Sequence, residues 1–237
     1  MSQLPLQIVP RRAYSARNYL KHSGVRSAFE QLLVFLSQPG FRIASVEGAP
    51  RVGLTHFSIA LAQALSEKGQ FPRLVEGADF FEWANERRQQ QGEDPGEIVI
   101  VDDGDQYLGN IAANDGGHFV SIVESLRRSR SALVMLMHVP YSECGCDDHV
   151  LSRLRAGELI RIAGPADDDM VELIGQMANQ RGINLSRRNQ QYLAKRLPRD
   201  VSSIDDCLER AQQLAQLSGQ GFKLPVLSDA IPSGNRR

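Results

Sequence analysis

The sequence predicts an α/β domain, with a parallel sheet and flanking helices, followed by a small all-helical domain. Residues 41–56 have the pattern of a buried strand, a glycine-containing loop and an amphipathic helix. Residues 98–101 form a continuous apolar run, Ile-Val-Ile-Val, which is typical of a strand covered on both faces. From Pro165 onward only helical periodicity remains. The two patterns therefore indicate two structural units in one chain.

We expect four regions along the chain. Residues 1–20 form an irregular N-terminal segment, and residues 21–164 form the α/β domain. Residues 165–231 form the helical domain, and residues 232–237 form a polar tail. Each of the three main helices of the second unit starts near an Asp or Ser, the residue types that cap helix N-termini.

The individual elements follow from periodicity and from breakers. Helices are expected over about 25–36, from Thr55 to Lys68, and over 79–91, 117–130, 167–181, 186–196, 200–217 and part of 223–231. Strands are expected over about 43–46, 71–77, 97–103, 132–137 and 158–162. The intervening stretches, including residues 103–105 and 151–157, read as turns and loops.

Composition excludes several classes of protein. The chain has 237 residues, 42% of them hydrophobic, which is enough to bury a core without disulfides. A formal net charge of −1 gives no overall attraction to nucleic acid, so strong direct DNA binding is not expected. No run approaches the ~20 apolar residues that span a bilayer, and the N-terminus lacks the order of a signal peptide. We therefore expect a cytoplasmic protein. A disulfide framework is not expected, because the chain has three cysteines, an odd number, and no export signal.

The glycine loop carries the first chemical motif. It fits G-x-x-x-x-G-K-[ST] at Gly48, Gly53 and Thr55, but Leu54 stands where the lysine belongs. In such loops the backbone N–H groups bind phosphates at a helix N-terminus, and the lysine supplies a positive charge to them. Leucine can pack in the same place but brings no charge. The motif predicts a phosphate-type loop with weakened affinity.

Two acids follow the apolar strand at its carboxyl end, where open parallel sheets bind ligands. Asp102 would hold Mg²⁺ through water, and Asp103 would polarise an attacking water. The alternative is a plain acidic turn, Asp103-Gly104-Asp105. The phosphate-type loop upstream favours the functional interpretation.

Cys144, Cys146 and His149 have metal-ligand side chains. A fourth ligand is not evident in this Asp- and Gly-rich stretch, so no metal site is expected there.

These motifs together resemble an AAA+ module. Gly53 to His56 resembles the G-K-T-H that opens the loop helix in the DnaA replication-initiator family, and residues 150–162, VLSRLRAGELIRI, are similar to its SRL/SRF-x-x-G stretch. Residues 181–215 resemble the lid pattern of that family. The chain stops without a helix-turn-helix domain and carries Gln3-Leu4-Pro5-Leu6, which is similar to the Hda-type regulatory branch that couples the sliding clamp to DnaA.

The resemblance implies roles for particular residues. Gln3, Leu4 and Leu6 would be a clamp-binding peptide, with a strand on the protein's own surface as the alternative. Arg153 would be an arginine finger that reaches the nucleotide of a neighbouring DnaA, and Asp103 would be the second catalytic group. A surface or inter-domain salt bridge is the other interpretation of Arg153, and Arg155 remains a second candidate for the finger.

The sequence departs from the family at three nucleotide contacts. Leu54 replaces the phosphate lysine, Ser202 stands where the lid's sensor arginine belongs, and Gly24 stands about where an asparagine lies beside the adenine. Arg199 lies close to one helical turn from Ser202 and would be a partial substitute. The resemblance implies ADP or ATP with Mg²⁺, bound by Gly48, Gly53, Thr55, Asp102 and Arg199. The departures predict weak binding or none.

Three functions follow in order. The first is a negative regulator of replication initiation that binds the sliding clamp and promotes ATP hydrolysis by DnaA, without being an independent ATPase. The second is a non-catalytic adaptor on the same scaffold. The third, a true ATPase or nucleotide kinase, requires Leu54 to be tolerated. The expected partners are DnaA and the clamp, and a homo-oligomer remains open.

Overall fold

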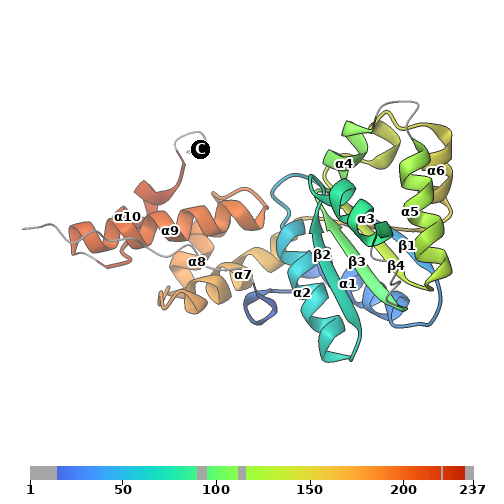
Figure 1. Cartoon of the computed structure of the whole chain (residues 1–237). Helices are drawn as coiled ribbons and strands as arrows, with labels where there is room; N and C mark the ends of the chain where they lie inside the picture. Colours follow the sequence, from blue (N-terminus) through green and yellow to red (C-terminus); the bar gives the residue numbers. More distant parts are fainter. Residues whose placement is uncertain (1–14, 90–94, 112–115, 220, 233–237) are drawn as a thin grey trace, which may run out of the picture.

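The computed structural model describes residues 15–89, 95–111, 116–219 and 221–232, in two units that lie side by side (Figure 1). The first is a five-stranded sheet with helices on both faces, and the second is a group of four helices. The sheet contains β1 (Arg42–Gly48), β2 (Phe71–Glu76), β3 (Glu97–Asp102), β4 (Ala132–Met137) and β5 (Glu158–Ile162). The strand order is β2-β3-β4-β1-β5, and every pair is parallel.

The central strands explain the apolar runs of the sequence. All six residues of β3 and of β4 are buried, because helices cover both faces of the sheet. Side chains alternate along β3: Ile98 and Ile100 join one core, and Val99 and Val101 join the other. The predicted α/β class with a parallel sheet is confirmed.

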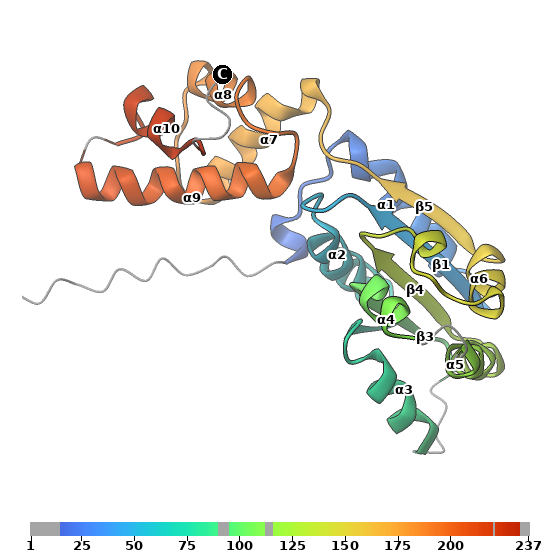
Figure 2. The same cartoon turned by 90° about the horizontal axis from the view of Figure 1, so that it is seen from above.

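The helices form a layer on each face (Figure 2). One core combines the sheet with α1 (Ser23–Leu36) and α2 (Leu54–Glu67). The opposite core combines it with α3 (Phe80–Gln89), α4 (Gly104–Asn110), α5 (Gly116–Arg128) and α6 (Asp148–Arg155). Single turns of 3₁₀ helix occur at η1 (Ala16–Asn18) and η2 (Tyr141–Glu143).

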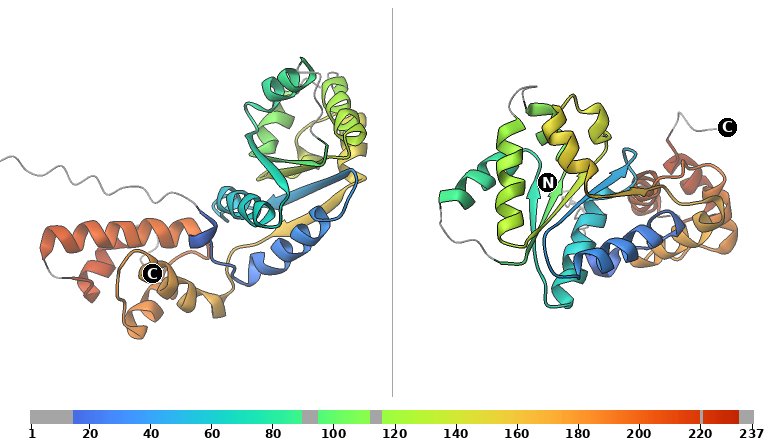
Figure 3. Two further views of the ribbon diagram at one scale, coloured as in Figure 1. Left: turned by 60° about the horizontal axis from the view of Figure 1, so that its bottom comes forward. Right: turned by 90° about the vertical axis from the view of Figure 1, so that its right-hand side faces the viewer.

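The remaining helices, which we call the lid, are α7 (Asp167–Gln180), α8 (Arg187–Ala194), α9 (Val201–Ser218) and α10 (Leu224–Ala230). They form a unit beside the sheet in both views of Figure 3. Their own core is formed by residues such as Leu173, Ile204 and Leu208. The caps expected from sequence are present, since Ser186 accepts from the Asn189 N–H and Asp200 accepts from the Ser203 N–H at 2.6 Å.

Two glycines make the connection between the units possible. The Ala163 N–H donates to the Gly24 carbonyl at 3.0 Å, and a Cβ on Gly24 would lie 2.3 Å from the Ala163 oxygen. A Cβ on Gly164 would lie 2.1 Å from the Arg199 oxygen. Real side chains do not tolerate such distances from backbone atoms. Gly24 stands about where the DnaA family has an asparagine beside the adenine. In this structure the backbone packing at the junction requires a glycine at this position.

Two helices were not expected from sequence. Residues 104–110 form α4 instead of a turn, and residues 148–155 form α6 instead of a loop. The signal for α6 was present in the sequence, because Asp147 caps it by accepting from the Val150 N–H at 2.9 Å. Arg153 and Arg155 therefore lie on a helix, and the expectation that they share a loop was wrong.

Within the described residues, no helix is long and apolar enough to cross a lipid bilayer.

Candidate functional site

A cavity of about 400 Å³ lies between the glycine loop, the segment before α1 and the lid. Its apolar side chains come from residues on both units: Tyr19, Leu20, Leu173, Met177 and Val201. Its polar side chains include Thr55, His138, Ser202, Asp205 and Asp206. The glycine loop, the segment before α1 and the lid therefore line one site at the carboxyl end of the sheet.

The glycine loop has the backbone that its motif predicts. Gly53 precedes α2 with a φ of 97°, a conformation that glycine adopts without strain. Gly48 ends β1 against the side chains of Val52 and Ile162, and a Cβ on it would lie 2.8 Å from each. Leu54 is 2% exposed and belongs to the core below α2. It therefore stabilises the start of the helix and brings no charge to the site.

Thr55 and Asp102 come together behind the loop. Asp102 ends β3 and is 4% exposed, and Thr55 hydrogen-bonds to its carboxylate. Burial raises the pKa of Asp102 to about 6, although the hydrogen bond with Thr55 acts in the opposite direction. Its Oδ1 is buried without a hydrogen-bond partner. A hydroxyl and an unsatisfied carboxylate oxygen are a donor set that fits Mg²⁺.

His138 and Asp103 lie at the same end of the sheet. The Nδ1 of His138 is 3.1 Å from the Gly48 carbonyl, so this nitrogen carries the proton and donates to it. Its Nε2 lies 3.7 Å from Asp103 Oδ1. Asp103 directly precedes α4 with a φ of 50°, an uncommon conformation for a residue with a side chain, and its carboxylate makes no capping hydrogen bond to the helix. The structure thus brings Gly48, Gly53, Thr55, Asp102 and Asp103 to one region.

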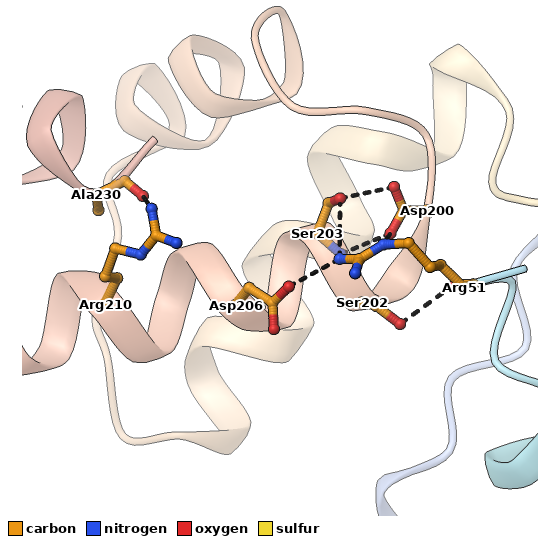
Figure 4. Close-up of polar contacts among 7 residues, drawn as sticks. All are labelled: Arg51, Asp200, Ser202, Ser203, Asp206, Arg210 and Ala230. Carbon is orange, nitrogen blue, oxygen red and sulfur yellow. Dashed lines mark hydrogen bonds and ion pairs between the residues drawn. The ribbon is translucent and has the colours of Figure 1, made fainter. Parts of the chain in front are cut away.

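Arg51 is the site residue that the sequence analysis missed. It lies in the glycine loop with a φ of 69°, and its side chain reaches the first turns of α9 (Figure 4). Its Nε is 3.2 Å from Asp200 and its Nη2 is 2.7 Å from Asp206. The hydrogen bond to Asp206 is the main reason that the pKa of Arg51 is raised. These partners are about 150 positions away in the chain, so no local pattern identifies them.

Two serines complete this contact between the loop and the lid. Nη2 of Arg51 also donates to Ser203 Oγ at 3.3 Å, and the Ser202 hydroxyl donates to the Arg51 carbonyl at 3.4 Å. Ser202 therefore lies at the cavity wall, beside the glycine loop.

Arg199 is not brought to this cavity. It forms an ion pair with Asp167 at the start of α7, and both side chains are more than 60% exposed. It is absent from the described lining of the cavity. The contact that it was expected to supply at the phosphate-type loop is not made, because its side chain is directed along the lid surface.

Arg153 and Arg155 lie at the opposite end of the sheet. They end α6, which leads into the first residue of β5, whereas the glycine loop follows the last residue of β1; β1 and β5 are parallel. Arg153 donates to the His149 carbonyl at 3.0 Å and lies 3.8 Å from Glu124 on α5. Its Nε is buried without a partner. Arg153 therefore cannot act on a ligand in the cavity of its own chain.

Arg155 differs from Arg153 in its surroundings. It is exposed, and among the described residues it makes no hydrogen bond or ion pair. Positions two apart on a helix point about 200° away from each other. Only one of the two side chains can face a given partner.

Gln3, Leu4 and Leu6 lie outside the described residues. The thiols of Cys144 and Cys146 donate to backbone carbonyls, and burial raises the pKa of Cys144 to about 11. Within the described ranges no group of three or more His, Cys, Asp or Glu side chains is arranged to hold a metal ion.

Comparison with known proteins shows a distant sequence similarity to the replication initiator DnaA. No family model matches the chain. It is 20% identical over 135 residues to the chromosomal replication initiator protein DnaA of Herminiimonas arsenicoxydans, and 21% identical over 136 residues to that of Burkholderia multivorans. These matches cover 57% of this chain but only 29% and 26% of the relatives, so the chain matches less than a third of their length.

Solved structures resemble nearly the whole chain. Domain III of Thermotoga maritima DnaA aligns with a TM-score of 0.77 and 13% identity, over 94% of this chain and 98% of that one. A DnaA bound to AMPPCP and single-stranded DNA aligns with a TM-score of 0.67 and 18% identity, over 87% and 65%. The T. maritima RuvB branch-migration motor aligns at 0.68 and 12%, over 92% and 71%. The chain therefore has the AAA+ fold and is similar in sequence to DnaA.

Proposed function

We propose that this chain is a regulator of DNA replication initiation that presents Arg153 to ATP bound by a DnaA-type initiator and thereby promotes its hydrolysis. The observation that carries the proposal is the position of Arg153, at the end of the sheet opposite the chain's own cavity. From that end of the sheet Arg153 can reach a nucleotide only in another molecule. The similarity to DnaA in sequence and fold supports a DnaA-type initiator as that partner.

The surroundings of Arg153 suit this role. Its side chain is 26% exposed, and its contact with Glu124 at 3.8 Å is long for a hydrogen-bonded ion pair. The His149 carbonyl fixes one end of the guanidinium. A partner's phosphate can therefore replace Glu124 without a rearrangement of α6. A guanidinium at this position would stabilise charge on the transferring phosphoryl oxygens.

The chain's own cavity is a secondary feature in this proposal. Thr55 and Asp102 fit Mg²⁺, which would neutralise phosphate charge if a nucleotide were bound. Leu54 and Ser202 leave the phosphates without the two cations of the family pattern. We expect weak binding of ADP or ATP and no useful hydrolysis by this chain alone.

Tethering to the sliding clamp is the second half of the proposal. Gln3, Leu4 and Leu6 combine a polar anchor with two aliphatic side chains, which is a common composition for short peptides that fill a groove. The proposal predicts that Gln3→Ala weakens binding to the clamp and leaves direct binding to DnaA unchanged. A pull-down with each partner separates the two effects.

The decisive experiment measures ATP hydrolysis by purified DnaA in the presence of clamp and this chain. Arg153→Ala should reduce the stimulation by about 10³-fold or more, as for other trans-acting arginines. Arg188→Ala is a matched control, because Arg188 is an exposed arginine on α8 of the lid. Loss of stimulation in Arg155→Ala instead would transfer the role to that residue.

A non-catalytic adaptor is the alternative, and the loss of the loop lysine at Leu54 favours it. In that case the wild-type chain binds DnaA without stimulating hydrolysis, and Arg153→Ala leaves binding unchanged. Turnover by the purified chain alone, abolished by Asp103→Asn, would instead support an independent ATPase.

A further inference from the structure

The charges around the cavity do not match those of a polyphosphate. Arg51 is the arginine in its lining, and Asp200 and Asp206 hold its guanidinium at 3.2 and 2.7 Å. One cation between two carboxylates leaves a net charge of −1. Asp205, which also lines the cavity, is paired with Arg181 at 2.6 Å. The lid therefore presents the carboxylates of Asp205 and Asp206 to the cavity beside the glycine loop, whereas a phosphate chain is stabilised by cations.

The rest of the cavity is suited to an uncharged ligand. Tyr19, Leu20, Leu173 and Met177 supply apolar surface. His22, which also lines the cavity, is only 6% exposed, and its Nδ1 has no hydrogen-bond partner. A buried polar atom without a partner costs free energy, so a ligand that hydrogen-bonds to it is favoured. A volume of about 400 Å³ is within the range of small-molecule sites.

We propose that Arg51 determines the ligand specificity of this cavity. Its guanidinium is held by Asp200 and Asp206, so the cavity accepts an uncharged nucleoside and discriminates against the same nucleoside carrying a polyphosphate. Asp200 and Asp206 already occupy the Nε and Nη2 of Arg51, so a phosphate chain that approaches this guanidinium also faces their two carboxylates. Leu54 offers no replacement charge. This preference is the reverse of the preference that an intact phosphate-type loop has.

The inference concerns the chain's own cavity and does not depend on Arg153. The proposal that Arg153 stimulates hydrolysis by DnaA and the proposal that Arg51 selects the ligand of the cavity can therefore be refuted separately. Different assays test them.

The test is a calorimetric titration of adenosine, ADP and ATP, with Mg²⁺, into the full chain. Adenosine is the probe because a similar solved structure holds an adenine nucleotide analogue. The wild-type chain should bind adenosine at least as tightly as ATP. Asp206→Asn should tighten ATP binding by about tenfold, since it removes a carboxylate and releases one donor of Arg51, while adenosine affinity stays the same.

Glu209→Gln is the matched control for this variant. Glu209 is on the same helix and its substitution changes the charge by the same amount, but Glu209 does not line the cavity. Its affinities should equal those of the wild type. Three results would overturn the proposal: ATP binding tenfold tighter than adenosine in the wild type, no adenosine binding at millimolar concentrations, or equal ATP affinity in Asp206→Asn and Glu209→Gln. Melting curves of both variants verify that they are folded.

Discussion

At the scale of single residues, Asp102 shows how the fold changes the chemistry of a side chain. Its carboxylate is buried at the end of β3, with Asp103 and Glu76 nearby. Burial is the largest reason that its pKa rises to about 6, and the hydrogen bond with Thr55 only partly compensates. The charged form is therefore less stable in the folded protein than in the unfolded chain. A divalent cation at the unsatisfied Oδ1 would reverse that penalty.

This raised pKa predicts how stability depends on pH. Because the folded protein holds the proton more tightly than the unfolded chain, Asp102 costs nothing below about pH 4, and its cost grows as the pH rises to about 6. Asp102→Asn removes the ionisable group. Urea unfolding should show the variant more stable than the wild type by about 1–3 kcal/mol at pH 7, without added Mg²⁺, and little different at pH 4.

The exposed Asp168→Asn is a suitable control for this series. It should leave the shape of the wild-type curve unchanged above pH 5. A constant difference between Asp102→Asn and wild type at all pH values would contradict a raised pKa in the folded state.

At the scale of elements, the junction between β5 and α7 depends on glycine. Gly164 lies against the Arg199 carbonyl, just before α9, and Gly24 lies against the Ala163 and Gly164 carbonyls at the start of α1. These three segments are far apart in sequence and approach at backbone distance. The position of the lid over the cavity therefore depends on the absence of two side chains.

Gly164→Ala should separate these segments. The added Cβ would lie 2.1 Å from a backbone oxygen, which cannot rotate away as a flexible side chain would. We expect a loss of about 1–3 kcal/mol in unfolding free energy and faster amide exchange at the start of α9. Gly109→Ala is the control, because a Cβ on Gly109 in α4 would meet nothing within 4 Å. That variant should be neutral or slightly stabilised; equal losses in both variants would refute the packing argument.

At the scale of the whole molecule, the sheet unit and the lid have separate cores, and a few polar contacts add to the backbone packing at Gly24 and Gly164 and to the contact of Leu20 with the lid core. Arg51 links the glycine loop to α9, and Ser23 at the start of α1 hydrogen-bonds to Asp169 of α7. Most of the side chains in the Arg51 contact are partly exposed, so each ion pair contributes little alone. The lid is therefore held by several weak contacts, and the loss of one should change its mobility before its fold.

Arg51→Gln tests this coupling without any ligand. Amide exchange should become severalfold faster in residues 48–53 and 200–206, because the two segments lose their mutual contact, while exchange in the lid core stays the same. Arg210→Gln is the matched control, since Arg210 is on the same helix but donates to the Ala230 carbonyl within the lid (Figure 4). Unchanged exchange in Arg51→Gln would show that the ion pairs do not hold the lid.

Strands, loops and helix caps that depend on residues adjacent in the sequence were predictable from the sequence alone. The apolar run before Asp102 predicts a buried parallel strand because helices must cover both of its faces. Gly53 and Thr55 predict a phosphate-type loop, and capping residues predict the long lid helices. The short helix α4 was missed because it begins in an Asp- and Gly-rich, turn-like stretch, and α6 was missed although Asp147 supplies its cap.

Only the tertiary structure decides which of these features meet. It brings Arg51 to Asp200 and Asp206, gives Gly24 its packing role, turns Arg199 away along the lid surface, and places Arg153 at the far end of the sheet from the cavity. The physical reason is how far apart in the sequence the interacting residues lie. Hydrophobic periodicity, caps and turns are determined within a few residues, whereas an ion pair between positions 51 and 206 depends on how two independently formed cores are docked.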